Sequence, residues 1–210
     1  LVRAVDGTSF YVMPGQILGL VGESGCGKSV TMKAVLQLIE PPGRITHGAI
    51  LFRRDAPGPD KAGAAIDLAR VPPRGPLMRD IRGGEIALIP QEPMAAFSPV
   101  HTVGAQIVEA IMLHAHRWQA GNRPITRADA RGIVIGLFRD VGISMPEQRV
   151  DAYSWQLSGG LRQRAMIAMA LSCKPRLLIA DEPTTAIDVT TQAQVLALLR
   201  DLQQKYNTTI

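Results

Sequence analysis

The sequence has no apolar run long enough to cross a bilayer as a helix. Its longest strictly apolar run, residues 165–171, has seven residues, whereas a membrane-spanning helix needs about 18 or more. It has two cysteines, Cys26 and Cys173, too few for a disulfide framework and typical of a reducing compartment. These shortages exclude an integral membrane helix protein and a small secreted disulfide scaffold.

Aromatic residues are also scarce, at 4% of the chain. The net charge is +5, and much of the excess lies in residues 53–84, where seven Arg or Lys residues face four Asp residues without a single aromatic. Proteins that bind nucleic acid usually concentrate more charge and add aromatic side chains that stack on bases. We therefore expect no nucleic-acid partner and interpret this segment as a solvated loop.

What the chain does have is the length and composition of one globular domain. It has 210 residues, of which 46% are hydrophobic and 20% charged, an ordinary globular balance. It begins at Leu1 rather than Met and ends on the β-branched run Thr208, Thr209 and Ile210. Because a strand rarely ends a domain so abruptly, we expect this to be a piece of a longer chain, truncated at both ends.

Hydrophobic periodicity predicts alternating strands and helices. Alternation over residues 2–12 predicts a pair of β segments, and apolar runs predict strands at 17–21, 49–52, 85–89 and 176–180. Helical spacing predicts helices at 30–39, 103–114, 126–140, 158–173 and 188–206, and Thr126 with Asp129 forms a capping-box pattern. This order predicts an α/β core interrupted by a helical insertion.

A glycine-rich loop carries the strongest chemical signal. Residues 22–29 match G-x-x-x-x-G-K-[ST] between a predicted strand and a predicted helix. In this motif, backbone N–H groups and the helix N-terminus hold phosphate oxygens, the lysine reaches the β- and γ-phosphates, and the final hydroxyl binds Mg²⁺. The predicted phosphate-binding residues are Gly22, Glu23, Ser24, Gly25, Cys26, Gly27, Lys28 and Ser29.

A second chemical signal is an apolar strand that ends in two carboxylates. Residues 177–180 precede Asp181 and Glu182, and Pro183 bends the chain after them. In a phosphate-loop ATPase, the first carboxylate holds Mg²⁺ and the second orients or polarises the attacking water. Alone this pattern is weak, but downstream of a phosphate loop it is strong.

With Ser158, Gly159 and Gly160 opening a helix 23 residues before Asp181, these motifs resemble those of the ATP-binding cassette (ABC) ATPases. Within them the chain is most similar to the ATPase subunits of oligopeptide, dipeptide and nickel importers. The residues that carry this closer match lie at positions 4–7, 22–29, 91–94, 99, 102–104, 157–171 and 180–190.

The resemblance implies a role for each matching residue. Gln91 matches the glutamine that senses Mg²⁺ and the attacking water, and Glu182 matches the catalytic carboxylate. Ser158, Gly159 and Gly160 match the signature that covers the γ-phosphate of the opposite protomer. Asp188 matches the aspartate that crosses the dimer interface. We therefore expect Glu182, Gln91 and Lys28 to act in catalysis, ATP and Mg²⁺ to be bound, and Ser29, Gln91 and Asp181 to serve the metal.

The resemblance also implies the architecture and the partners. The expected fold is an α/β P-loop NTPase (RecA-like) core with an N-terminal antiparallel β segment and an inserted α-helical subdomain. Residues 1–90 and 175–210 would form the nucleotide-binding core of one truncated ABC ATPase domain, and residues 91–174 the helical signature subdomain. The implied partners are transmembrane permease subunits and a second ATPase subunit, identical or different, at the cytoplasmic face of the inner membrane.

The sequence departs from the family pattern at two places and leaves alternatives open. Leu161 follows the signature where many members have Gln, and Pro90 precedes Gln91 where an aromatic is common. The family's switch histidine and adenine-stacking aromatic would lie outside residues 1–210. The alternative to an importer motor is a soluble ABC ATPase of DNA repair or translation, although 67 residues between Gln91 and Ser158 are too few for a long coiled-coil arm. A non-hydrolysing half-site is disfavoured by Lys28, Asp181 and Glu182.

Overall fold

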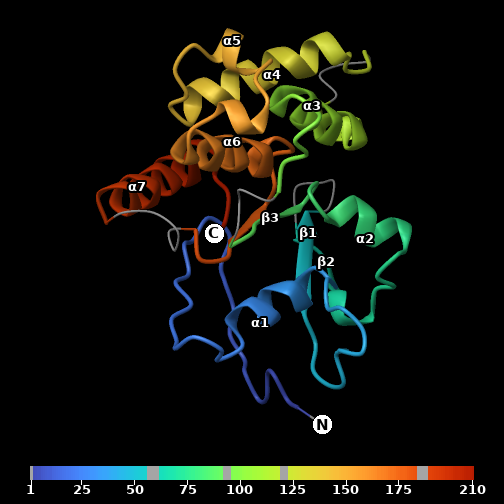
Figure 1. The fold of residues 1–210 in the computed structure, drawn as a ribbon. Helices are drawn as coiled ribbons and strands as arrows, with labels where there is room; N and C mark the ends of the chain where they lie inside the picture. Colours follow the sequence, from blue (N-terminus) through green and yellow to red (C-terminus); the bar gives the residue numbers. More distant parts are fainter. Residues whose placement is uncertain (1, 56–61, 92–95, 119–122, 184–188) are drawn as a thin grey trace. The chain divides into compact units, whose positions relative to one another are not determined.

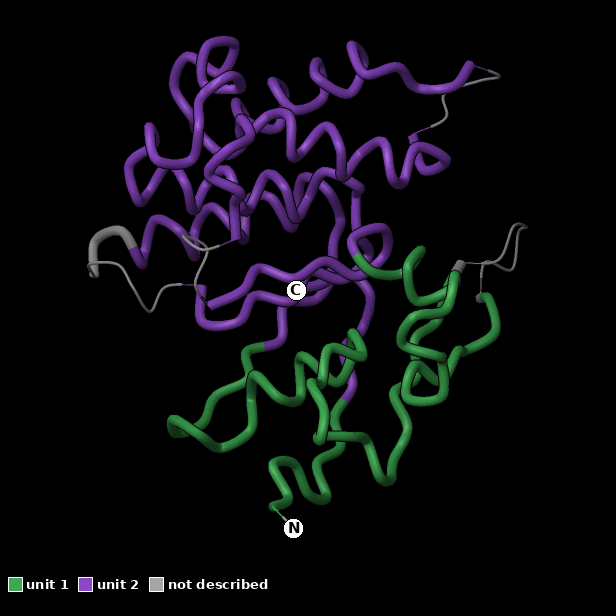
Figure 2. Tube along the Cα trace, turned by 45° about the vertical axis from the view of Figure 1, so that its right-hand side comes forward, with its two compact units in different colours: residues 1–10, 19–82 green, residues 11–18, 83–210 purple. Residues whose placement is uncertain are grey.

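A computed structural model describes residues 2–55, 62–91, 96–118, 123–183 and 189–210 (Figure 1). The chain forms two compact units, coloured separately in Figure 2. Unit 1 consists of residues 1–10 and 19–82, and unit 2 of residues 11–18 and 83–210.

The described residues of unit 1 form one longer helix, one hairpin and two short helical segments. These are α1 (Lys28–Val35), β1 (Leu51–Asp55), β2 (Ala62–Asp67), the 3₁₀ helix η1 (Leu68–Arg70) and α2 (Pro76–Ile81). The hairpin is antiparallel and pairs Leu51 with Asp67 and Phe52 with Ile66. Its apolar interior consists of the buried side chains of Leu36, Leu68, Val71, Met78 and Ile81. The expected strand near residues 49–52 is present, whereas β2 and α2 lie where a loop was expected.

The helix that follows the glycine-rich loop is shorter than its hydrophobic pattern predicts. We expected it to reach residue 39, but α1 ends at Val35 and Gln37 adopts a left-handed φ of 53°. The guanidinium of Arg82 donates to the carbonyl oxygens of Leu36 and Gln37, at 2.7 and 2.8 Å. These carbonyls are thereby satisfied without another helical turn.

Unit 2 contains a parallel strand pair and a group of helices. Its elements are β3 (Ile86–Ile89), α3 (Val103–Leu113), η2 (Ala115–Trp118), α4 (Arg127–Asp140), α5 (Pro146–Arg149), η3 (Ser154–Gln156), α6 (Gly159–Leu171), β4 (Leu177–Ala180) and α7 (Val189–Tyr206). Helix α6 packs against both α4 and β3 (Figure 1). One continuous apolar cluster therefore runs from the strands through α6 to α3 and α4.

Side-chain caps explain why the helices of unit 2 begin where the sequence predicts. Thr126 and Asp129 form the expected capping box at the start of α4. Thr102 caps α3 by accepting from Ala105 N, and Ser158 caps α6 by accepting from Leu161 N. Each cap satisfies an N–H group that has no partner inside its helix. The predicted helices at 103–114, 126–140 and 158–173 are confirmed within a few residues.

Two predictions for the first 21 residues are wrong. No strand forms within residues 2–12, where Val2 and Tyr11 are 95% and 82% exposed. Residues 17–21 form no strand either: Leu18 N donates to Ile210 O and Ile210 N to Gln16 O, but no further ladder bond joins residues 19–21 to a described strand. Apolar alternation indicates a strand only where a partner strand and an apolar layer are available.

No helix in the described part of the chain combines the length and the mean hydropathy needed to span a bilayer.

Candidate functional site

The phosphate loop lies in unit 1 and is closed by its own lysine. Lys28 Nζ donates to the carbonyl oxygens of Gly22 and Glu23, both at 2.8 Å. Gly25 and Gly27 have φ values of 80° and 96°, which residues with a side chain rarely adopt. A Cβ on Gly27 would also lie 2.4 Å from the carbonyl oxygen of Ala4. The loop therefore requires glycine at position 27 for two independent reasons.

Helix α1 begins directly at the end of this loop, so its first backbone N–H groups lie beside Lys28 and Ser29. Gly27 precedes the helix and makes no side-chain cap, and the first turn contains no acidic residue. The helix N-terminus thus keeps its partial positive charge. Backbone N–H groups, this helix end and the Lys28 ammonium are the donors that an anionic phosphate needs.

A hollow of about 250 Å³ lies beside the loop within unit 1. Its walls include Cys26, Gly27 and Lys28 from the loop, Thr31 from α1, and Phe10. We did not single out Phe10 or Thr31 from the sequence. Thr31 lies one helical turn after Gly27, and its N and Oγ1 both donate to Gly27 O at 2.9 Å. Nothing in the local pattern pointed to Phe10.

In unit 2, strand pairing brings together two predicted catalytic side chains. Strands β3 and β4 are parallel, and Ile89 pairs with Ala180. Two residues beyond that pair on each strand are Gln91 and Glu182, and Gln91 Nε2 donates to Glu182 Oε2 at 2.8 Å. The carboxyl ends of parallel strands meet at one edge of a sheet, so the register itself produces this contact.

The backbone around Glu182 is constrained on both sides. Asp181 N donates to Ile89 O at 3.0 Å, which continues the ladder by one residue. Glu182 itself has a left-handed φ of 48°, and Gln163 Nε2 donates to Pro183 O. The chain therefore turns sharply at the carboxylate. The sequence showed Gln163 two residues after Leu161 but assigned it no role.

The signature residues lie at the N-terminus of α6, also in unit 2. Ser158 is the N-cap, and its Oγ accepts from Leu161 N at 3.4 Å. Ser158 and Gly159 are exposed. A Cβ on Gly159 or Gly160 would meet no heavy atom of the described residues within 4 Å beyond its own helix. Packing inside this unit therefore does not require glycine at either position.

Within unit 2 the structure brings several predicted site residues together. Lys28 and Ser29 belong to unit 1, whereas Gln91, Asp181 and Glu182 form one cluster in unit 2. Asp188 lies outside the described residues. The roles of all these residues, and the division into a core and a helical subdomain, remain predictions.

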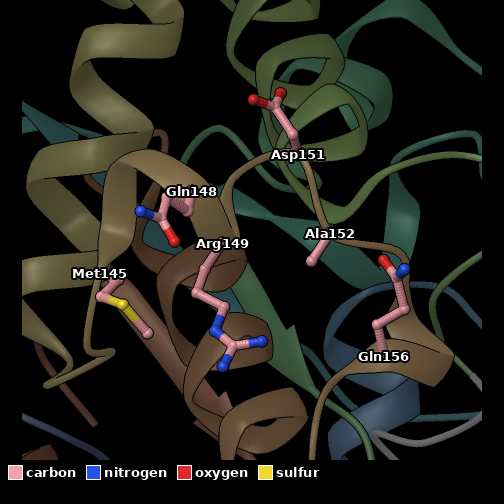
Figure 3. Close-up of a pocket in the computed structure, with 6 residues that line it drawn as sticks. All are labelled: Met145, Gln148, Arg149, Asp151, Ala152 and Gln156. Atoms are coloured by element: carbon pink, nitrogen blue, oxygen red, sulfur yellow. The ribbon is translucent and has the colours of Figure 1, made fainter.

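A second hollow, of about 320 Å³, lies in unit 2 and contains none of the predicted site residues (Figure 3). It is lined by Met145, Gln148, Arg149, Asp151, Ala152 and Gln156. Asp151 already accepts two hydrogen bonds from Arg131, both at 2.7 Å, and these bonds lower the pKa of Asp151. The acid that lines this hollow is therefore satisfied within the protein.

Comparison with known proteins identifies the family. The family described as "ABC transporter" matches residues 5–185. The Escherichia coli protein named "Dipeptide transport ATP-binding protein DppD" is 47% identical over 98% of this chain and 56% of its own length. The Sinorhizobium fredii protein named "Probable peptide ABC transporter ATP-binding protein y4tR" is 44% identical over 100% of this chain and 57% of its own length.

A solved structure supports the fold. The dimeric ATP-binding cassette MJ0796, bound to ADP and Pi, superposes with a TM-score of 0.75 at 21% identity, covering 98% of this chain and 77% of that one. The chain belongs to the ABC transporter family and has the ABC cassette fold. It spans a little over half the length of the two curated relatives.

Proposed function

We propose that this chain is the nucleotide-binding part of the ATP-hydrolysing subunit of an ABC importer for peptides or related small solutes. The observation that carries the proposal is the 2.8 Å hydrogen bond between Gln91 Nε2 and Glu182 Oε2. These side chains are 91 residues apart in the sequence, and the resemblance to ABC ATPases implies that both act on the attacking water.

In this proposal the phosphate loop binds ATP. The Lys28 ammonium exchanges the carbonyl oxygens of Gly22 and Glu23, which it contacts now, for the β- and γ-phosphate oxygens. Backbone N–H groups of residues 22–29 and the N-terminus of α1 supply the remaining donors. Charge-assisted hydrogen bonds to phosphate are stronger than bonds to neutral carbonyls, so the exchange is favourable.

Glu182 accepts a proton from the attacking water, and Gln91 orients that water. The hydrogen bond between them engages one carboxylate oxygen, Oε2, and the proposal assigns the proton of the water to this carboxylate. Because the Gln91 amide nitrogen is the donor, its carbonyl oxygen is directed to other partners. A carboxylate and an amide oxygen beside each other can hold one water molecule at a defined angle.

The side chains that the sequence assigns to the metal have the chemistry that suits Mg²⁺. Ser29, Gln91 and Asp181 offer a hydroxyl, an amide oxygen and a carboxylate, and Mg²⁺ typically takes one or two carboxylates plus substrate phosphates. In the described part of the chain, no group of three or more His, Cys, Asp or Glu side chains could hold a metal by itself. The nucleotide would therefore complete the coordination. When bound, the ion neutralises charge on the β- and γ-phosphates.

The proposal extends to partners and location. A second ATPase subunit would present its Ser158, Gly159 and Gly160 to the phosphate bound by this chain, and Asp188 would lie at that interface. Permease subunits would hold the pair at the cytoplasmic face of the membrane. Residues 1–90 and 175–210 would act as the nucleotide-binding core and residues 91–174 as the signature subdomain. The names of the relatives support a peptide as the transported solute.

The test is ATP binding and hydrolysis by the full-length protein with its membrane subunits. We expect Mg²⁺-dependent turnover that EDTA abolishes, and ATP-dependent uptake of a labelled di- or oligopeptide into proteoliposomes. Lys28→Ala should weaken ATP binding by at least about 100-fold, since the loop loses its ammonium. Lys33→Ala is the matched control, because Lys33 is exposed on the same helix. Equal ATP affinity in both variants would refute the phosphate-loop assignment.

A further inference from the structure

We propose that Gln163 is a positioning residue for hydrolysis, which holds the turn at Glu182 through the carbonyl of Pro183 and ties it to the signature helix. This inference rests on the proposed hydrolysis at Glu182. It concerns a side chain that touches neither the nucleotide nor the reacting water in the roles assigned above.

The first support is the backbone conformation of Glu182. Its φ of 48° lies in the left-handed region, which is unfavourable for residues with a Cβ. Such a residue keeps this conformation only where its surroundings fix the chain on both sides. Before Glu182, Asp181 N is bonded to Ile89 O at 3.0 Å. After it, the contact is the hydrogen bond from Gln163 Nε2 to Pro183 O.

The second support is the chemistry of Pro183. Proline has no backbone N–H, so its carbonyl is the one polar backbone group through which this residue can be held. Gln163 Nε2 donates its hydrogen bond to this carbonyl oxygen. In the described part of the chain, this is the one hydrogen bond that a side chain of α6 makes to residues 181–183. Its loss would leave the backbone after Glu182 without a link to α6.

The third support is the burial of Gln163 itself. The residue is 4% exposed, and among the described residues its Oε1 has no hydrogen-bond partner. An unpaired buried amide oxygen costs free energy, which a Leu or Met side chain of similar size would avoid. Packing alone therefore does not explain a glutamine here, whereas the need for its N–H donor does.

The position of Gln163 on α6 gives the contact its consequence. The same helix begins with Ser158, Gly159 and Gly160, and Gln163 lies on its second turn. A helix is stiff over this length, so α6 links the signature residues to the turn that aims Glu182. A displacement of the signature residues would then move Gln163, and its hydrogen bond to Pro183 O would shift the Glu182 carboxylate.

The test compares Gln163→Met with Met166→Leu in the full-length protein with its membrane subunits. Gln163→Met removes the donor and keeps the length of the side chain. Met166 is also buried on α6, at 4% exposure, and its change to Leu conserves volume. We expect Gln163→Met to lower kcat about tenfold, with the ATP Kd within about twofold and the melting temperature unchanged or higher. Met166→Leu should keep kcat within about twofold.

A double-variant cycle distinguishes positioning from a general structural effect. If Gln163 acts through the turn at Glu182, the changes Gln163→Met and Gln91→Ala both disturb the position of the Glu182 carboxylate. Their effects on kcat should then be non-additive, and the double variant should be about as slow as the slower single variant. Multiplicative losses, or a kcat that falls only with the folded fraction, would overturn the inference. Wild-type protein without ATPase activity would instead refute the proposed function.

Discussion

Asp140, the last residue of α4, accepts a hydrogen bond from Lys205 Nζ at 2.5 Å, and its other oxygen accepts from the hydroxyl of Tyr206. The end of α7 is therefore fastened to α4 by a carboxylate that is only 23% exposed. Burial by itself raises the pKa of Asp140. The hydrogen bonds from Lys205 and Tyr206 and the charge of Lys205 together lower it by more than burial raises it, so the pKa lies below its ordinary value.

This contact predicts how stability depends on pH. A carboxyl with a depressed pKa in the folded state stabilises the protein above its unfolded pKa of about 3.9 and loses that effect as the pH falls through the folded pKa. Asp140→Asn should therefore lower the free energy of unfolding by about 1–2 kcal/mol at pH 7. The difference from wild type should shrink below about pH 4.

Chemical denaturation of both proteins at a series of pH values checks this expectation. Asp201→Asn is the matched control, because Asp201 lies on the exposed side of α7. A destabilisation by Asp140→Asn that is the same at pH 7 and pH 3 would show that the charge of Asp140 does not stabilise this contact.

Glu182 gives the second prediction. Glu182→Gln keeps the shape of the side chain and leaves an oxygen that can still accept from Gln91 Nε2, but it removes the group that takes the proton. We expect ATP binding within about threefold of wild type and a kcat lower by about 10²–10⁴-fold. Nucleotide titration and steady-state hydrolysis measure the two effects separately. A variant that still hydrolyses ATP at the wild-type rate would exclude Glu182 as the catalytic carboxylate.

The helices of unit 2 and the strand-end cluster were predictable because their signals are local or follow from one register. Thr126 and Ser158 mark helix starts through bonds to residues three positions away. Once 85–89 and 176–180 are recognised as parallel strands, Gln91 and Glu182 must lie at the same edge. The motifs at 22–29 and 158–160 were visible for the same reason, since each is a short contiguous segment.

The remaining features depend on residues far apart in the sequence. Helix α1 ends at Val35, and the carbonyls of Leu36 and Gln37 just after it accept from Arg82, 46 positions from Leu36. The apolar alternation at residues 2–12 predicted strands, but it could not reveal that Val2 and Tyr11 lie exposed. The left-handed turn at Glu182 and the contact from Gln163 involve backbone geometry that no periodicity encodes.

The glycines of the signature give the third prediction. Gly159 and Gly132 are both helical and both have open space where a Cβ would be placed. Replacing either with Ala should leave the protein as stable as wild type or more so by about 0.5–1 kcal/mol, because Ala is the better helix former. Only Gly159→Ala should lower ATP hydrolysis, by about tenfold or more, since a methyl group there would obstruct a phosphate.

Thermal unfolding and hydrolysis rates of the two glycine variants test this together. If Gly132→Ala reduced hydrolysis as much as Gly159→Ala, helix rigidity rather than access to the signature would be responsible. A loss of stability in Gly159→Ala would mean that the open space at this glycine is filled in the protein.

The last prediction concerns which phosphate the signature serves. The N-terminus of α6 carries Ser158 as an exposed cap. In the part of the chain that the structure describes, nothing beyond the helix lies within 4 Å of the Cβ positions of Gly159 and Gly160. Such an open helix end suits a ligand presented by another subunit. In a two-fold symmetric pair, each signature would face the other chain's phosphate loop, and the two interfaces would be equivalent. We therefore expect Ser158→Arg to damage hydrolysis at the partner's nucleotide rather than at its own.

Mixing two inactive variants shows whether the signature acts on the partner's nucleotide or on the nucleotide of its own chain. Full-length Ser158→Arg and Lys28→Ala proteins are each expected to be inactive alone, with their membrane subunits present. In the mixed dimer one site carries both defects, while the other combines an intact phosphate loop with an intact signature. Hydrolysis should return to a fraction of the wild-type rate, provided that one site can turn over alone. Where two different ATPase subunits pair, the changes are placed one on each subunit. Two results together would rule out action across the interface. One is that the mixed dimers form, as shown by co-purification of two tags, and yet stay inactive. The other is that mixing wild-type with Ser158→Arg protein removes hydrolysis only at the altered chain's own nucleotide.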